Sequence, residues 1–401
     1  ISLAVWSAFT ALTGLASEIT IGGFVISGFA VLFACRVGVG IGEAGCTPPA
    51  NSLIADYYPA AKRSSALGYY AMGVTLGTML ANAVGGQITD AFGWRAAFFI
   101  LGVPGVAIAT LLVFTVKEPP RGYSDPPDVK KAAKADLWPA MQQMFSKPSW
   151  WTMTAGATLA AFCGYAIAGF QSLYLQRTFH LSAGEASLWV NTPSYLAGAV
   201  GTVITGWLAM KMRSRSVAAI AWLPAIGLIL SVPFYFWGFL STSLVICAIG
   251  LSIGHFVKYG YLAAQYTISQ GVVSSTVRAT STAVMLFVIN MLGYGLGPPF
   301  AGFLSDFFFR NAADDAGFPG FTNAGCDAAA EAIRKAGENP NIADVLASMA
   351  RPITEAQLAF CGPANAAATQ NSLLVISALY AAAGLCFFAC MFTLKKDMVA
   401  K

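Results

Sequence analysis

The chain has 401 residues, of which 57% are hydrophobic and 10% are charged. Soluble domains carry roughly 25% charged residues, so this composition excludes an ordinary water-soluble globular protein. The net charge of +5 does not indicate a nucleic-acid partner, because the basic residues lie in short loops between apolar runs. The opening segment, ISLAVWSAFTALTGLA, lacks the basic start of a cleavable signal peptide.

Apolar runs long enough to span a bilayer, about 20 residues each, recur along the whole chain. These runs are too long and too uniformly apolar for the strands of a barrel, so they predict an all-α integral membrane protein. Ten membrane-spanning helices are expected, at residues 1–16, 22–46, 65–89, 95–116, 150–175, 188–211, 217–239, 242–270, 279–304 and 372–394.

A polar, basic and Pro-rich segment separates the first four of these helices from the last six, and a short amphipathic helix is expected inside it near 136–146. The predicted domains are a helical bundle (1–116), a linker (117–149), a six-helix bundle (150–394) with an outer loop (305–371), and a tail (395–401). Lys and Arg are in excess in the loops on the side of Lys62 and Arg63, which predicts that the linker and the C-terminal tail are cytoplasmic.

The outer loop contains two cysteines, Cys326 and Cys361. A disulfide between them is expected in an oxidising compartment. The alternative is a pair of free thiols.

Two stretches of the chain, 40–90 and 254–306, share landmarks. In the first, a polar loop ends at Arg63 and the next helix ends in a Thr-Asp pair at Asp90. In the second, a polar loop ends at Arg278 and the next helix ends in a Ser-Asp pair at Asp306. At the offset that relates the two arginines, 278 − 63 = 215, Glu43 aligns with Lys258. We therefore expect an internal repeat in which these two residues are equivalent.

The segment CRVGVGIGEAG contains the spacing G-x-G-x-x-G. A dinucleotide-binding turn needs a preceding strand and an acidic residue about 20 residues later, whereas here an apolar helix runs into the glycines. Gly38, Gly42 and Gly45 recur at helical spacing, which favours a smooth face for close packing and sliding of helices. Asp90 and Asp306, at the ends of the repeats, are expected to take part in gating.

Three charged residues, Arg36, Glu43 and Lys258, lie well inside apolar segments. A charge in mid-membrane costs several kcal/mol unless it is paired or hydrated, so such residues are functional candidates. Arg36 and Glu43 are two helical turns apart and share one face. The alternatives are a hydrogen-bond node for Arg36, a helix-packing acid for Glu43, and a Lys258 whose amine extends to the cytoplasmic side.

Further polar and aromatic residues in the later helices are candidates for an amphipathic cavity, although each alone is also explained by a helix–helix contact. The candidates for binding substrate are Tyr165, Gln171, Tyr195, Tyr259, Gln265 and Asn290, together with Arg36 and Lys258. His255 lies one turn before Lys258 and is a candidate for proton coupling together with Glu43.

Longer motifs carry a family resemblance. RVGVGIGEA (36–44) resembles the fourth-helix motif of the major facilitator superfamily, and GGQITDAFGWR (85–95) resembles the passage from its fifth to its sixth helix. INMLGYGLGPPFAGFLSD (289–306) resembles its eleventh helix. The Glu in GIGEA and the TPPANSLIADYYP loop are most similar to the Spinster branch of lysolipid and sphingolipid-phosphate transporters.

This resemblance implies a two-bundle fold in which the chain starts at the third of twelve helices, so that ten are present. It also implies a monomeric secondary transporter of the cell membrane that works by alternating access and needs no cofactor or metal. The expected substrate is a lysophospholipid or related single-chain lipid phosphate, with protons and membrane lipids as the other partners. Arg36, and with it Lys258, would hold the phosphate, and Glu43 would carry a coupling proton.

Two other transport functions remain open at this stage, and a third function, that of an enzyme, is disfavoured. A proton-coupled exporter of small organic anions or drugs would use the same residues, and so would a passive lipid conduit or scramblase. A membrane-embedded enzyme is disfavoured, because the two histidines, His180 and His255, have no spacing that suggests a shared site.

Overall fold

The computed structural model describes most of the chain, and its contacts divide it into two compact units. Unit 1 consists of residues 1–132 and 183–188, and unit 2 of residues 133–182 and 189–401. The described residues are 1–21, 24–46, 50, 53–54, 57–58, 60–117, 119, 137–213, 218–274, 277–335, 341–349 and 352–398. Most of the predicted linker, including Lys130 and Lys131, and much of the TPPANSLIADYYP loop lie outside them.

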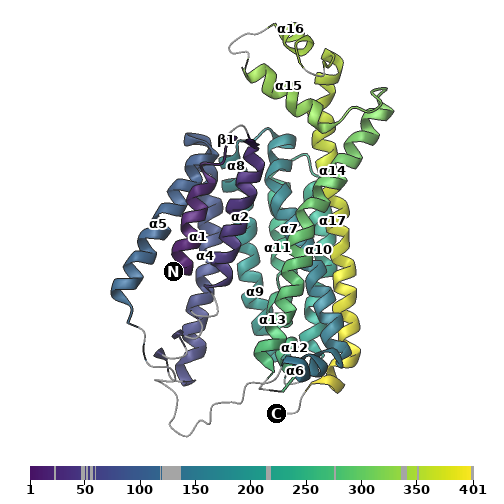
Figure 1. Ribbon diagram of the computed structural model, residues 1–401. Helices are drawn as coiled ribbons and strands as arrows, with labels where there is room; N and C mark the ends of the chain where they lie inside the picture. The colour runs from purple at the N-terminus through teal and green to yellow at the C-terminus, as the bar shows by residue number, and fades with distance from the viewer. Residues whose placement is uncertain are drawn as a thin grey trace. The chain divides into compact units, whose positions relative to one another are not determined.

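Unit 1 is built around α1, which packs against both α2 and α5 (Figure 1). A short antiparallel pair of strands connects α1 to α2, and α4 packs against α5 and α8. The elements are α1 (Ser2–Thr13), β1 (Ile19–Ile21), β2 (Phe24–Ile26), α2 (Gly28–Ala44), α4 (Ala60–Phe92), α5 (Trp94–Thr115) and α8 (Ala183–Ala186).

Unit 2 is a helical bundle in which α17 packs along α7, α10 and α14 (Figure 1). Two of its long helical segments contain a π-helical turn, η1 or η2. Its elements are α6 (Leu137–Phe145), α7 (Pro148–Phe179), η1 (Ser187–Asn191), α9 (Thr192–Arg213), α10 (Ala219–Phe239), α11 (Leu244–Lys258), α12 (Tyr261–Gly271), α13 (Arg278–Val288), η2 (Ile289–Tyr294), α14 (Gly295–Asp315), α15 (Asn323–Lys335), α16 (Ile342–Ala347) and α17 (Glu355–Asp397).

The prediction of an all-α membrane fold is confirmed. Among the described residues, six helical segments are long and apolar enough to cross a bilayer. They are Trp94–Thr115, Pro148–Phe179, Ala219–Phe239, Leu244–Gly271, Thr280–Asp315 and Glu355–Asp397. The short helix expected near 136–146 is present as α6.

Local chemistry explains where several helices begin and end. The Ser27 side chain accepts a hydrogen bond from the Ala30 amide and caps α2, and Thr354 and Gln357 form a capping box at the start of α17. Gly93, with φ of 81°, separates α4 from α5 in a conformation that a side chain would strain.

Two predicted boundaries are wrong. The helix expected over 22–46 begins only at Gly28, because residues 24–26 pair as a strand with residues 19–21. The outer loop expected over 305–371 is largely helical: α14 continues to Asp315, α17 begins at Glu355, and α15 and α16 lie between them. Long helices thus extend past the apolar runs that the sequence marks.

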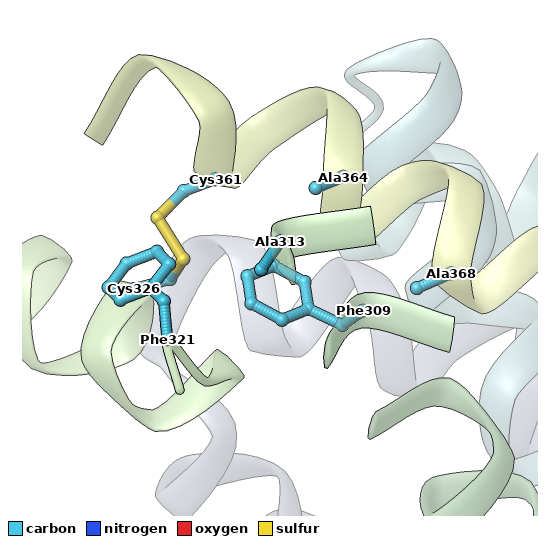
Figure 2. Close-up of a cluster of buried hydrophobic side chains, with 7 residues drawn as sticks. All are labelled: Phe309, Ala313, Phe321, Cys326, Cys361, Ala364 and Ala368. Carbon is cyan, nitrogen blue, oxygen red and sulfur yellow. A yellow bond between two sulfur atoms is a disulfide. The ribbon is translucent and has the colours of Figure 1, made fainter. Parts of the chain in front are cut away.

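The helical ends of α14 and α17, with α15 and α16, form a small subdomain at one end of unit 2 (Figure 1), which we call the cap (residues 305–371). Figure 2 shows its apolar core, made of Phe309, Ala313, Phe321, Cys326, Cys361, Ala364 and Ala368. A disulfide joins Cys326 on α15 to Cys361 on α17, so the expected pairing of these cysteines is present. The cap is therefore a built structure and not an open loop.

Candidate functional site

Helix α2 presents two charged residues on one exposed face. Arg36 and Glu43 are both exposed, in an otherwise apolar helix, and Phe33 and Gly40 lie on the same face at helical spacing. The Arg36 guanidinium lies over the Phe98 ring of α5, 4.9 Å from its centroid. Within the described part of unit 1, the Glu43 carboxylate has no hydrogen-bond or ion-pair partner.

Gly38 and Gly42 of α2, and Gly45 directly after it, lie on the opposite side, against α1. A Cβ atom at Gly38 would overlap the Phe9 ring, one at Gly42 would lie 2.6 Å from the Trp6 amide nitrogen, and one at Gly45 would lie 2.7 Å from the Ser2 hydroxyl. Gly40, on the charged face, has open space around it. The glycine-rich sequence thus permits close contact between two helices, and the helix runs through it without the strand that a nucleotide site requires.

Lys258, the last residue of α11, is enclosed in unit 2 with only 2% of its surface exposed. Its Nζ donates a hydrogen bond of 3.0 Å to the Tyr380 hydroxyl on α17. It also lies 4.8, 5.3 and 5.5 Å from the ring centroids of Tyr259, Tyr380 and Tyr235. We call these three rings the tyrosine cage. The structure thus shows a buried amine, not one that extends to the aqueous end of its helix.

His255 lies next to the cage and is also buried. Its Nδ1 is 3.0 Å from both the Tyr235 hydroxyl and the Leu251 carbonyl oxygen. The Tyr195 ring contacts its imidazole edge to face. Tyr195, Tyr259 and His255 are therefore brought together as predicted candidates, while Tyr235 and Tyr380 are additions that no local sequence signal marks.

The remaining substrate-binding candidates are spread over unit 2. Gln171 on α7 donates a hydrogen bond of 2.8 Å to Asn191 at the end of η1, and Gln265 on α12 is buried. Both have a buried side-chain oxygen without a partner among the described residues. The Tyr165 and Tyr294 rings are in contact, and Asn290 is exposed on η2. Their binding roles stay predictions.

The two predicted gating aspartates cap local structure. Asp90, near the end of α4, accepts a hydrogen bond of 2.8 Å from the Gly184 amide at the start of α8. Asp306 on α14 accepts one of 3.0 Å from the Asn323 side chain at the start of α15. Each therefore links a long helix to a short one.

One motif in this region resembles a hydrolase signature: residues 250–254, GLSIG, have the spacing G-x-S-x-G. A nucleophilic serine of this kind needs a sharp turn between a strand and a helix. Here the segment lies inside the continuous helix α11, and the Ser252 hydroxyl is 3.4 Å from that of Ser194. The glycines serve packing, since a Cβ at Gly250 would lie 2.8 Å from Gly238 on α10.

The sequence profile described as Major Facilitator Superfamily matches residues 1–298 of the chain. The chain belongs to this family. The family consists of secondary transporters, and this facilitator is a multi-pass integral membrane protein of that class.

Several relatives are similar to this facilitator. A solved bacterial homologue of the human lysosomal transporter Spinster, in an inward-facing and unoccupied conformation, superposes with a TM-score of 0.82 and 33% sequence identity, covering 100% of this chain and 83% of that one. An MFS-type efflux pump of Mycolicibacterium smegmatis is 30% identical over 71% of this chain and 65% of its own length. Spinster homolog 1 of Xenopus laevis is 28% identical over 76% of this chain and 59% of its own length.

These findings confirm a facilitator that is related to Spinster. The chain spans 65% and 59% of the lengths of the two curated relatives just described. The substrate, the coupling ion and the direction of transport are therefore matters for proposal.

Proposed function

We propose that this facilitator moves a lysophospholipid or a related single-chain lipid phosphate by alternating access, coupled to protons. The observation that carries the proposal is Arg36, an exposed cation on an apolar face of α2. Facing lipid, such a charge costs several kcal/mol. Facing a water-filled path, it is a ready binding group for a phosphate, which a guanidinium holds through two parallel hydrogen bonds.

The surroundings of Arg36 suit a molecule with an anionic head and an apolar chain. Phe98 supports one face of the guanidinium plane and leaves its N–H edge available to an anion. Phe29 and Phe33, further back along α2, are 77% and 61% exposed. An acyl chain extending from a phosphate bound at Arg36 would meet these rings, and its burial would add about 0.8 kcal/mol for each methylene group.

Glu43 supports the proton-coupled form of the proposal. It lies on the same face as Arg36, about 10.5 Å further along the helix axis, so an anionic substrate at Arg36 and a proton at Glu43 would occupy one face without direct contact.

A second candidate function is proton-coupled export of small organic anions or drugs. It is favoured by the efflux pump of Mycolicibacterium smegmatis, which matches 71% of this chain. A passive lipid conduit would use the same residues, but lipid flux through it would not saturate.

We also propose the cell membrane as the location, with the linker and C-terminal tail in the cytoplasm, on the basis of the Lys and Arg distribution.

Uptake of labelled lysophospholipid into proteoliposomes, with and without an imposed pH gradient, tests the proposal. Saturable uptake that the gradient changes is expected for the wild type. Arg36→Gln should lower uptake about tenfold or more, the cost of losing a charge-assisted pair, and Glu43→Gln should leave uptake insensitive to the gradient. Arg310→Gln, which removes an exposed charge on α14 in the cap, is the matched control.

The outcomes separate the candidates. Uptake that does not saturate would contradict a carrier and support a conduit. Saturable uptake that ignores the gradient in the wild type would contradict proton coupling. Absence of lipid uptake, with export of anionic dyes intact, would replace the lipid with a small organic anion.

A further inference from the structure

Lys258 is an amine buried without an anion. Its contacts are one tyrosine hydroxyl and three tyrosine rings, and no carboxylate pairs with it among the described residues. The cage comes from three helices of unit 2: α10 supplies Tyr235, Tyr259 directly follows α11, and α17 supplies Tyr380. A lysine that served only to stabilise the bundle would be expected to pair with a carboxylate or to reach water.

The groups around Lys258 accommodate it both with and without its extra proton. Enclosing an ammonium without a counter-charge is unfavourable, and each of the three ring faces offsets part of that cost. The Tyr380 hydroxyl can accept a hydrogen bond from an ammonium or donate one to a neutral amine. Because burial and the cage act on the ammonium form in opposite directions, a change in the cage changes the balance between the two protonation states.

The other titratable groups that face Lys258 are neutral hydroxyls, a thiol and an imidazole. They are Cys163 on α7, Tyr235 on α10, His255 and Tyr259 on or next to α11, and Tyr380 on α17, and Tyr195 on α9 lies behind them against His255. Among the described residues none of these supplies a permanent negative charge. Entry of water is therefore the event that most favours the ammonium form.

The internal repeat expected from the sequence supports a matching role for Lys258 and Glu43. The two residues are related by the repeat offset, 258 − 43 = 215. Each also lies at the C-terminal end of its helix, since α2 ends at Ala44 and α11 at Lys258. An acid in unit 1 and a base in unit 2 thus occupy equivalent places.

We propose that Lys258 is the proton-exchanging group of unit 2 during transport, protonated when the tyrosine cage opens to water and neutral when the cage closes. On closing, Nζ passes one proton to the departing water, and on opening it takes one back. This inference rests on the proton coupling in the proposed function and adds a residue to it: the cage, not the substrate, is the partner of Lys258 in the closed state.

Transport by Lys258 variants is the first test. Lys258→Met keeps the length of the side chain but cannot bind a proton, and Lys258→Arg stays charged. Both should lose the gradient-driven part of uptake by about tenfold or more. Lys211→Met is the matched control, because the Lys211 amine lies 5.1 Å from the Trp207 ring but is exposed. A wild-type gradient response in Lys258→Met would overturn the inference.

A second measurement does not depend on transport. In protein labelled with ¹⁵N at lysine Nζ, the spectrum should contain one amine resonance that changes from its neutral to its charged position as the pH is lowered and is absent from Lys258→Met. A Lys258 resonance that stays in the ammonium position throughout would overturn the inference, even if both variants misfold. Gradient-insensitive uptake by the wild type would instead overturn proton coupling in the proposed function.

Discussion

Several polar side chains in the described part of this facilitator lie against aromatic rings and hydroxyls. The tyrosine cage surrounds Lys258 with ring faces, and the neighbouring His255 is held by the Tyr235 hydroxyl and a backbone carbonyl. In unit 1, Arg36 rests on Phe98. Ring faces stabilise a cation without fixing it as tightly as a carboxylate does, which suits side chains whose partners change during a transport cycle.

The glycines of α2 give a prediction at the same scale. In Gly42→Ala the new methyl group would lie 2.6 Å from the Trp6 backbone nitrogen, and a backbone atom cannot swing aside. We expect a loss of about 1–3 kcal/mol, the usual cost of overpacking, and a lower midpoint of thermal unfolding in detergent. In Gly40→Ala nothing lies within 4 Å, so the better helix former should leave the midpoint equal or higher. Equal midpoints for both variants would contradict the close contact of α1 with α2.

The sequence predicted the positions of Arg36 and Glu43 on one helical face because local periodicity decides which residues share a face. It could not predict the tyrosine cage. Tyr235 and Tyr380 are 23 and 122 positions from Lys258 (258 − 235 and 380 − 258), so only the packing of α10 and α17 on α11 and α7 brings them together. Local patterns carry no information about such distant neighbours.

Helices of unit 2 are tied together at their ends as well as along their apolar faces. The N-terminus of α7 has no cap from its own preceding residue, Lys147. Instead, Asp397 at the end of α17 accepts a hydrogen bond of 3.0 Å from the Ser149 amide. A carboxylate there satisfies a free N–H group and complements the positive end of the helix dipole.

This contact gives a prediction about an element. Asp397→Ala removes both the acceptor and the charge, and we expect a loss of about 1–2 kcal/mol, as for a lost N-cap. Asp397→Asn keeps an acceptor oxygen and should lose only part of that. The measurement is thermal unfolding in detergent, with Asp315→Ala at the exposed end of α14 as the control. If Asp397→Ala unfolds like the wild type, α17 does not cap α7.

The apolar runs predicted where helices lie in the chain, but they often did not predict where a helix begins or ends. The apolar residues 24–26 fitted the beginning of a helix, yet they pair as a strand, because Ser27 caps α2 only afterwards. The polar ends of α14 and α17 gave no membrane signal and were read as a loop. They are helical because the cap buries Phe309, Ala364 and Ala368 in a core of its own.

At the scale of the whole molecule, unit 2 has two parts. One is a bundle whose long helices pack against one another, and the other is the cap, which has a core of its own. Among the described residues, α17 takes part in both, since it packs along α7 and α10 and also carries Cys361, Ala364 and Ala368. It has 43 residues, or about 65 Å at 1.5 Å per residue, roughly twice the thickness of a hydrocarbon core. The cap therefore extends the same helix beyond the membrane.

The disulfide between Cys326 and Cys361 should contribute a large part of the free energy that keeps the cap folded. It closes a loop with a sequence separation of 35 residues, for which about 2–4 kcal/mol is typical. The surrounding core is small (Figure 2), so Cys326→Ser with Cys361→Ser, or a reducing agent, should make the segment 316–354 sensitive to limited proteolysis. The helices α7 and α10, against which α17 packs in the bundle, should keep their protection, because they bury apolar residues such as Ala157 and Leu228 outside the cap. Cys386→Ala, which changes a half-buried free cysteine on the same helix, is the control and should be cleaved like the wild type.

Two outcomes would contradict this prediction. Unchanged proteolysis after reduction would show that the apolar core alone keeps the cap folded. Loss of protection throughout unit 2 would show that the cap and the bundle unfold as one.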